Sequence, residues 1–182
     1  HDVCREFDLY LFLDGARLPA ALVAEGNDLA PEDLAQYCDV FYCGGTKNGL
    51  LFGEAVVITN DRLKPHFRNM IKQRGGMFAK GYLFGLQFSA YFQDGLWLQM
   101  ARHAVAAAQR IKTAALEKGY TLQADSPTNQ IFLVTDDEKA AQLRERFVFE
   151  SFGRIDDHHE AARFVTSWAT PDADVDALID AL

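Results

Sequence analysis

The pattern of apolar and polar positions in the first third of the chain predicts buried strands that alternate with helices. Three apolar runs lack strict alternation, as expected for strands covered on both faces in a parallel sheet: residues 9–13, 39–43 and 54–59. Pro31, followed by acidic residues, predicts a short helix over 32–37 between the first two runs. The order strand, helix, strand, glycine-rich loop, strand indicates an α/β sheet.

The middle of the chain has the pattern of helices. Three segments qualify: residues 61–74, 82–92 and 96–118. The third segment repeats apolar side chains at helical spacing, and Gly119 is its expected stop. A long helix of this kind can join two parts of a protein.

The last third of the chain predicts a small α+β unit. Strands are expected at residues 120–124, 130–134, 147–152 and 162–168. Thr135 and Glu138 have capping-box spacing and predict a helix to about Phe147. Thr170-Pro171-Asp172 predicts the start of a final helix.

Composition narrows the classes of partner and the compartment. The formal charge is −8, and Lys and Arg form no basic stripe, which argues against nucleic acid and anionic membranes as partners. The apolar runs are too short or too interrupted to span a bilayer. Three cysteines without scaffold spacing predict reduced thiols in a cytoplasmic protein. Residues 1–7 have the pattern of a helix already under way, so we expect a piece of a longer chain.

Two predicted strands each end at an ionisable residue. Asp14 follows the first strand, and Lys47 closes the loop Gly44-Gly45-Thr46-Lys47 after the second. A pyridoxal-phosphate (PLP) enzyme needs such a pair, because a lysine forms the Schiff base and a carboxylate holds the pyridinium nitrogen. Small residues beside the lysine would let a cofactor approach the backbone. Arg17, one helical turn beyond Asp14, could hold a carboxylate in bidentate fashion.

Each of these residues also has an ordinary structural interpretation, which the sequence leaves open. Lys47 could be a solvated loop lysine, Asp14 a helix cap and Arg17 a surface residue. Cys38 and Cys43 flank one strand and fit a core better than a catalytic thiol. The pair His158-His159 lies beside two aspartates, but adjacent histidines point in different directions and no other ligand has metal spacing, so no metal is expected.

Three segments resemble one family of enzymes. They are Leu13-Asp14-Gly15-Ala16-Arg17-Leu18, the stretch Tyr42 to Ala55 around Gly-Gly-Thr-Lys-Asn-Gly, and Ala162-Arg163-Phe164-Val165-Thr166-Ser167-Trp168. Together they resemble low-specificity L-threonine aldolases, which are β-eliminating lyases among the fold-type-I PLP-dependent enzymes. The resemblance implies that Lys47 forms the Schiff base and that Asp14 contacts the ring nitrogen. It also implies that Arg17 and Arg163 hold the substrate carboxylate.

The same resemblance implies a fold and a division of the chain. The fold would be part of a fold-type-I large α/β domain with a mostly parallel sheet, followed by a small α+β C-terminal domain. We expect the large-domain part at residues 1–78, connecting helices at 79–118 and the small domain at 119–182. No residue matches the family's phosphate-binding loop or its ring-stacking histidine, so the chain resembles the C-terminal portion and is expected to be inactive alone.

The implied activity is the cleavage of L-threonine or L-allo-threonine, a small β-hydroxy amino acid, to glycine and acetaldehyde in a homodimer or homotetramer. Two alternatives stay open. Another amino acid β-eliminating lyase of the same fold would share Asp14 and Lys47 and differ in its substrate pocket. A non-catalytic α/β assembly module is the other, with the apolar-rich segment 83–100 as a possible interface.

Overall fold

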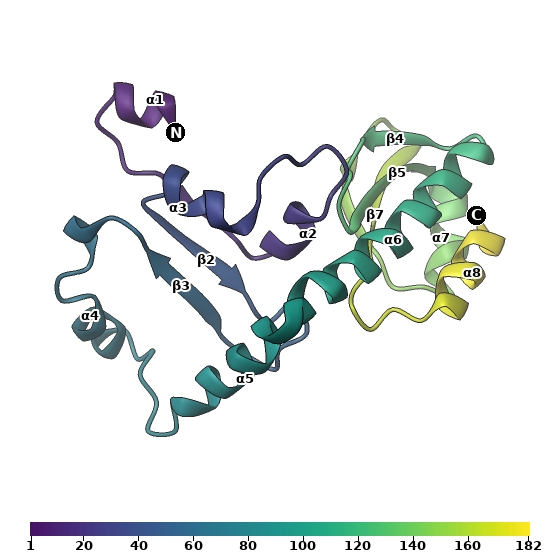
Figure 1. The fold of residues 1–182 in the computed structure, drawn as a ribbon. Helices are drawn as coiled ribbons and strands as arrows, with labels where there is room; N and C mark the ends of the chain where they lie inside the picture. The colour runs from purple at the N-terminus through teal and green to yellow at the C-terminus, as the bar shows by residue number, and fades with distance from the viewer. The chain divides into compact units, whose positions relative to one another are not determined.

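The computed structural model describes residues 1–182 and contains two compact units (Figure 1). The first unit consists of residues 1–22 and 28–97, and the second of residues 23–27 and 98–182. The division between the units lies near the start of helix α6 (Leu96–Glu117). The expected domain boundaries at residues 78 and 118 stay a prediction.

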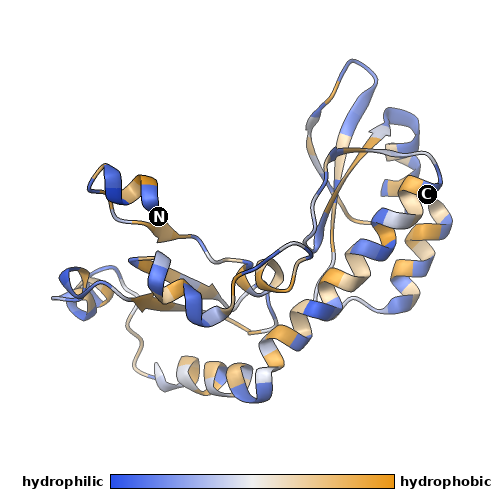
Figure 2. Ribbon diagram, turned by 45° about the horizontal axis from the view of Figure 1, so that its top comes forward, coloured by the Kyte–Doolittle hydropathy of each residue, from blue (hydrophilic) through white to orange (hydrophobic).

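The first unit is built on a three-stranded sheet in the order β1-β2-β3, formed by β1 (Phe12–Leu13), β2 (Val40–Gly44) and β3 (Glu54–Ile58). β1 and β2 are parallel, and β2 and β3 are antiparallel. These strands lie where the sequence predicts them. Figure 2 shows β2 and β3 coloured as hydrophobic along most of their length.

β1 is shorter than the apolar run that predicts it. The N–H of Leu11, the residue just before β1, has the side chain of Asp39 as its acceptor and not a backbone carbonyl of β2. The buried Asp39 carboxylate accepts the backbone N–H of Leu11 at 2.7 Å. The expected burial of both faces is also wrong for this strand. Phe12 of β1 is 58% exposed, and Leu9 before it 56%. The same expectation is wrong for β3, where Val56 is 47% exposed and Val57 38%.

Along the chain, short helices precede and follow the strands of this sheet. The helices of the first unit are α1 (Asp2–Glu6), α2 (Leu18–Leu22), α3 (Leu34–Tyr37), α4 (Phe67–Gln73) and α5 (Tyr82–Phe92), with 3-10 turns at Pro31–Asp33, Asp61–Leu63 and Gln93–Gly95. The predicted helix over 61–74 is divided, because His66 has a positive φ of 60°. α2 was not predicted from the pattern, although Pro19 at its second position is a helix-start signal.

The second unit is a four-stranded antiparallel sheet covered by helices. The strands β4 (Thr121–Ala124), β5 (Gln130–Asp136), β6 (Glu150–Arg154) and β7 (His159–Val165) have the order β4-β5-β7-β6. Side chains of α6, α7 (Asp137–Arg144) and α8 (Asp172–Ala181) form one core with β5 and β7. The buried residues of that core include Ile111, Leu133, Leu143, Phe164 and Val175.

In this unit, helix α7 and strand β7 begin at other residues than predicted, because strand pairing sets where they begin. Asp136, and not Thr135, is the N-cap of α7 and accepts the N–H of Lys139 at 2.7 Å. Thr135 stays in β5 opposite Glu160, because β5 and β7 pair along seven residues. The same pairing places β7 three residues before its predicted start.

The structure also bears on two expectations from composition. None of the helices combines the length and the apolar character that crossing a lipid bilayer requires. Cys4, Cys38 and Cys43 are all free, and the last two are buried, in agreement with their assignment to the core.

Candidate active site

The predicted site residues Asp14 and Lys47 lie on two neighbouring loops of the first unit. We call residues 14–17 the Asp loop and residues 44–49 the Lys loop. The parallel pairing of β1 with β2 sets Leu13 opposite Phe41. Both loops therefore begin at the same end of the sheet, where the carboxyl ends of these two strands lie. The N–H of Gly44 donates to the carbonyl of Gly15 at 2.9 Å and joins the loops directly.

Two glycines are required because the Asp loop packs so closely against β2. A Cβ on Gly15 would lie 1.6 Å from the carbonyl oxygen of Tyr42, and one on Gly44 would lie 2.4 Å from that of Ala16. Real Cβ atoms do not come within 3.0 Å of such atoms. Sequence reasoning explained the glycines by the approach of a cofactor. The structure gives Gly44 a second role, and it gives Gly15 its role, in the close packing of the Asp loop against β2.

Asp14 is an exposed carboxylate held by hydrogen bonds from β2 and from its own loop. It accepts the hydroxyl of Tyr42 and the backbone N–H of Ala16, the latter at 3.1 Å. The Tyr42 bond, then the Ala16 bond and the charge of Lys47, lower the pKa of Asp14 below its ordinary value. The bond to Asp14 raises the pKa of Tyr42 to about 12. At neutral pH, Asp14 is therefore ionised and Tyr42 is protonated.

We predict that Tyr42→Phe raises the pKa of Asp14 toward 3.8, because it removes the largest cause of the lowered value. A carboxyl group whose pKa falls on folding stabilises the protein above its unfolded pKa, and this stabilisation is lost as pH falls through the folded pKa. The variant should therefore lose less stability on acidification. Carbon-detected NMR titration of Asp14 measures the pKa, and an unchanged value would contradict the assigned cause.

Lys47 is exposed in the loop between β2 and β3, and Glu54 orders the residues before it. The Glu54 carboxylate accepts the N–H of Gly45 at 2.8 Å and the hydroxyl of Thr46 at 3.2 Å. This fixes the backbone from which the Lys47 side chain extends. Sequence reasoning missed Glu54, because only the antiparallel pairing of Gly44 with Glu54 brings it back to the loop.

The nearby cysteine is no rival nucleophile. Burial, with a smaller contribution from the charge of Glu54, raises the pKa of the Cys43 thiol to about 12. The thiol therefore stays protonated at neutral pH, and Lys47 is the exposed nucleophilic side chain of the Lys loop.

The two predicted carboxylate-binding arginines belong to different units. Arg17 ends the Asp loop just before α2, and its side chain is half-buried. Arg163 lies in β7 of the second unit, where its guanidinium forms an ion pair with Glu150 and donates to Gln130 Oε1 at 3.4 Å. The guanidinium carbon also lies 5.5 Å from the ring centroid of Phe152. Arg17 thus shares a loop with Asp14, and the substrate-binding roles of both arginines stay predictions.

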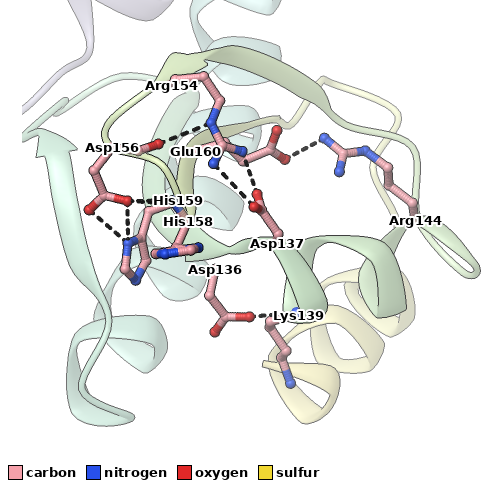
Figure 3. Close-up of polar contacts among 9 residues, drawn as sticks. All are labelled: Asp136, Asp137, Lys139, Arg144, Arg154, Asp156, His158, His159 and Glu160. Atoms are coloured by element: carbon pink, nitrogen blue, oxygen red, sulfur yellow. Dashed lines mark hydrogen bonds and ion pairs between the residues drawn. The ribbon is translucent and has the colours of Figure 1, made fainter.

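Acidic and basic side chains around the turn between β6 and β7 form a separate polar network (Figure 3). Asp156 accepts the backbone N–H groups of His158 and His159 at 2.8 Å each and contacts His159 Nδ1 at 2.8 Å. Arg154 binds Asp137, as Figure 3 shows. In residues 1–182, no three His, Cys, Asp or Glu side chains converge as metal ligands. These groups hold the turn together.

Comparison with known proteins places the chain in a class and then in a family. The solved structure of serine palmitoyltransferase from Sphingomonas wittichii matches with a TM-score of 0.68 over 99% of this chain and 48% of that one; at 12% identity it shows the fold alone. The structure of Leishmania major threonine aldolase matches with a TM-score of 0.95 and 39% identity over 98% of this chain and 52% of that one. The fold is that of the fold-type-I PLP-dependent enzymes, as predicted.

The comparison of sequences is more specific. The low-specificity L-threonine aldolase of a Pseudomonas species is 31% identical over 177 residues, which are 94% of this chain and 49% of that protein. The Escherichia coli K12 enzyme of the same name is 32% identical over 78% of this chain and 41% of its own length. The family model of the β-eliminating lyases matches residues 1–138. The chain belongs to the β-eliminating lyase family and spans about half the length of these curated relatives.

Proposed function

We propose that the chain is part of a PLP-dependent lyase that cleaves L-threonine or L-allo-threonine to glycine and acetaldehyde. One observation carries this proposal: an ionised carboxylate and an exposed lysine lie on loops that are hydrogen-bonded to each other at one edge of the sheet. The likeness of this chain to the Leishmania major threonine aldolase supports the substrate class.

The residues of the two loops fit PLP. Lys47 would hold it through a covalent bond between the ε-amine and the aldehyde carbon, with loss of water. Asp14 would accept a charged hydrogen bond from the ring nitrogen, because its lowered pKa keeps it ionised at neutral pH. The bound cofactor supplies the sink for the electrons of the bond that breaks.

The other residues of the chain would orient the substrate. Arg17 and Arg163 would each bind its carboxylate, since a guanidinium matches a carboxylate in bidentate geometry. The reaction breaks the Cα–Cβ bond, the β-hydroxyl proton leaves, and a proton returns to Cα. Glycine and acetaldehyde together then contain all the atoms of threonine.

The experiment is a product assay on the chain alone and on the chain combined with the amino-terminal half that the resemblance implies. We expect glycine and acetaldehyde in equal amounts from L-threonine or L-allo-threonine with the combination, and no turnover by the chain alone. Pyruvate and ammonia from tyrosine or tryptophan would instead identify another β-eliminating lyase. Activity of the chain alone would show that it needs no further segment.

A homo-oligomer is part of the proposal, but an assembly module would also associate, so labelling of Lys47 is what separates the two. Exposed apolar side chains gather on α5 and the segment before it, where Phe78 is 59% exposed and Leu86 60%. Faces of this kind mark interaction sites. A module without catalysis would share this face and yet show no lysine adduct after PLP and borohydride treatment, whereas the lyase would be labelled at Lys47.

We predict that Arg163→Ala raises the KM for threonine about 10- to 100-fold, the range for losing a hydrogen bond to a charged group. The absorbance spectrum of the bound cofactor should not change, because the residue is assigned to substrate. Arg154→Ala is the control, since Arg154 lies in the adjacent strand β6 and binds Asp137 instead. A loss of PLP affinity with an unchanged KM would contradict the role.

A further inference from the structure

We propose that Asn48 is a positioning residue that locks the Asp loop to the Lys loop. Its side-chain Nδ2 donates to the carbonyl of Ala16 at 2.9 Å and to the carbonyl of Gly44 at 2.7 Å. One acceptor belongs to each loop, so a single half-buried amide group bridges both. The inference rests on the proposed function only for the claim that these loops hold a cofactor.

The chemistry of the amide group suits this bridge. An Asn side chain has two N–H donors on one nitrogen, and here each has its own carbonyl acceptor. An aspartate has the same shape but offers no donor when ionised, and it would set a negative charge against two carbonyl oxygens. The bridge therefore depends on the amide nitrogen and not on side-chain size.

A backbone hydrogen bond of Asn48 couples the position of this residue to that of Lys47. The N–H of Asn48 donates to the carbonyl of Gly45 at 2.9 Å and closes a turn that contains Lys47. Glu54 also orders the Lys loop, but both of its hydrogen bonds go to that loop. Asn48 is different because its side chain reaches the Asp loop as well.

The spacing between the loops matters because Lys47 and Asp14 would hold opposite positions of one rigid pyridine ring. If the loops move apart, either the covalent attachment or the contact to the ring nitrogen is strained. A misplacement of about 1 Å can cost about 100-fold in rate. We infer that Asn48 keeps these two groups in register.

Hydrogen–deuterium exchange on the 182-residue chain tests the bridge without any cofactor. Asn48→Ala and the isosteric Asn48→Asp should both speed exchange of the Gly44 amide, which donates to Gly15, by about fivefold, the effect of losing roughly 1 kcal/mol. The central amides of β2 and β3 should keep their protection, which shows that the sheet still folds. Wild-type exchange at Gly44 in both variants would overturn the proposal.

Asn60→Ala is the matched control. The side chain of Asn60 also makes two hydrogen bonds, to Asp39 at 2.7 Å and from the N–H of Arg62 at 3.0 Å, at the other end of the same sheet. Its loss should speed exchange at Arg62 and leave Gly44 unchanged. Faster exchange at Gly44 in this control would show that the effect is general loosening and would overturn the assignment to Asn48.

The second arm uses the chain combined with the amino-terminal half that the resemblance implies. Asn48→Ala should lower kcat for threonine about 10- to 100-fold and change KM by a smaller factor, because catalytic geometry is lost while Arg163, outside the two loops, is kept. An unchanged kcat would overturn the positioning role even if the loops loosen. If borohydride labels no Lys47 in the wild type, the proposed function fails, and the exchange experiment still decides whether Asn48 bridges the loops.

Discussion

Lys47→Ala is expected to abolish both covalent retention of PLP and the cleavage of threonine. The ε-amine of Lys47 is the exposed nucleophile of the Lys loop, whereas the Cys43 thiol beside it is buried and protonated. Without that amine the cofactor has no covalent link to this chain, and an alanine cannot supply one. Turnover should fall to background.

The measurement is borohydride reduction in the presence of PLP, followed by peptide mapping and an acetaldehyde assay. The wild type should carry one label, on the peptide that contains Lys47, and the variant none. Lys72→Ala is the matched control, because Lys72 is an exposed lysine of α4 in the same unit. A Lys47→Ala variant with a lysine adduct and normal turnover would move the attachment point elsewhere.

The sequence predicts the secondary structure of this chain best where the pattern is local. α5 lies at its predicted residues 82–92, and α6 ends one residue before the predicted end, because helical periodicity and glycine stops are read within a few turns. Thr135 shows the limit. Its capping-box spacing is correct in form, but pairing with Glu160 in the neighbouring strand keeps it in β5.

The predicted burial of the first strand failed for a related reason. An apolar run shows that a strand can be covered on both faces, but not which segment covers it. Phe12 lies on the edge strand and remains more than half exposed in this chain. Burial of this kind depends on tertiary partners that the run itself does not name.

The candidate site also contains residues that the sequence predicts and residues that it does not. Asp14 and Lys47 are visible in the sequence because each ends a strand, and parallel strands bring such ends to one edge. Tyr42, Asn48 and Glu54 are not visible, since each acts through the register of β1, β2 and β3. The apolar run around a tyrosine does not indicate that its hydroxyl binds a carboxylate at the end of the neighbouring strand. Only the strand pairing shows this.

Asp14→Asn should keep the fold and lower kcat about 100- to 1000-fold, the range for removing one preorganised electrostatic contact from an active site. Asparagine has nearly the same shape and can still accept the N–H of Ala16. It carries no charge, however, and cannot hold the ring nitrogen protonated. The absorbance spectrum of the bound cofactor should then depend on pH at values where the wild-type spectrum is constant.

Two comparisons separate this electrostatic role from a structural one. Asp61→Asn is the control, because Asp61 is also an exposed carboxylate of the first unit whose pKa is lowered, in its case by Lys64. It should leave kcat unchanged. Tyr42→Phe should retain most activity, since Asp14 keeps its charge at neutral pH without the tyrosine hydroxyl and needs only the charge to act on the ring nitrogen. An Asp14→Asn variant with the wild-type kcat would remove Asp14 from the mechanism, whereas loss of activity in all three variants would indicate a damaged fold and not a missing charge.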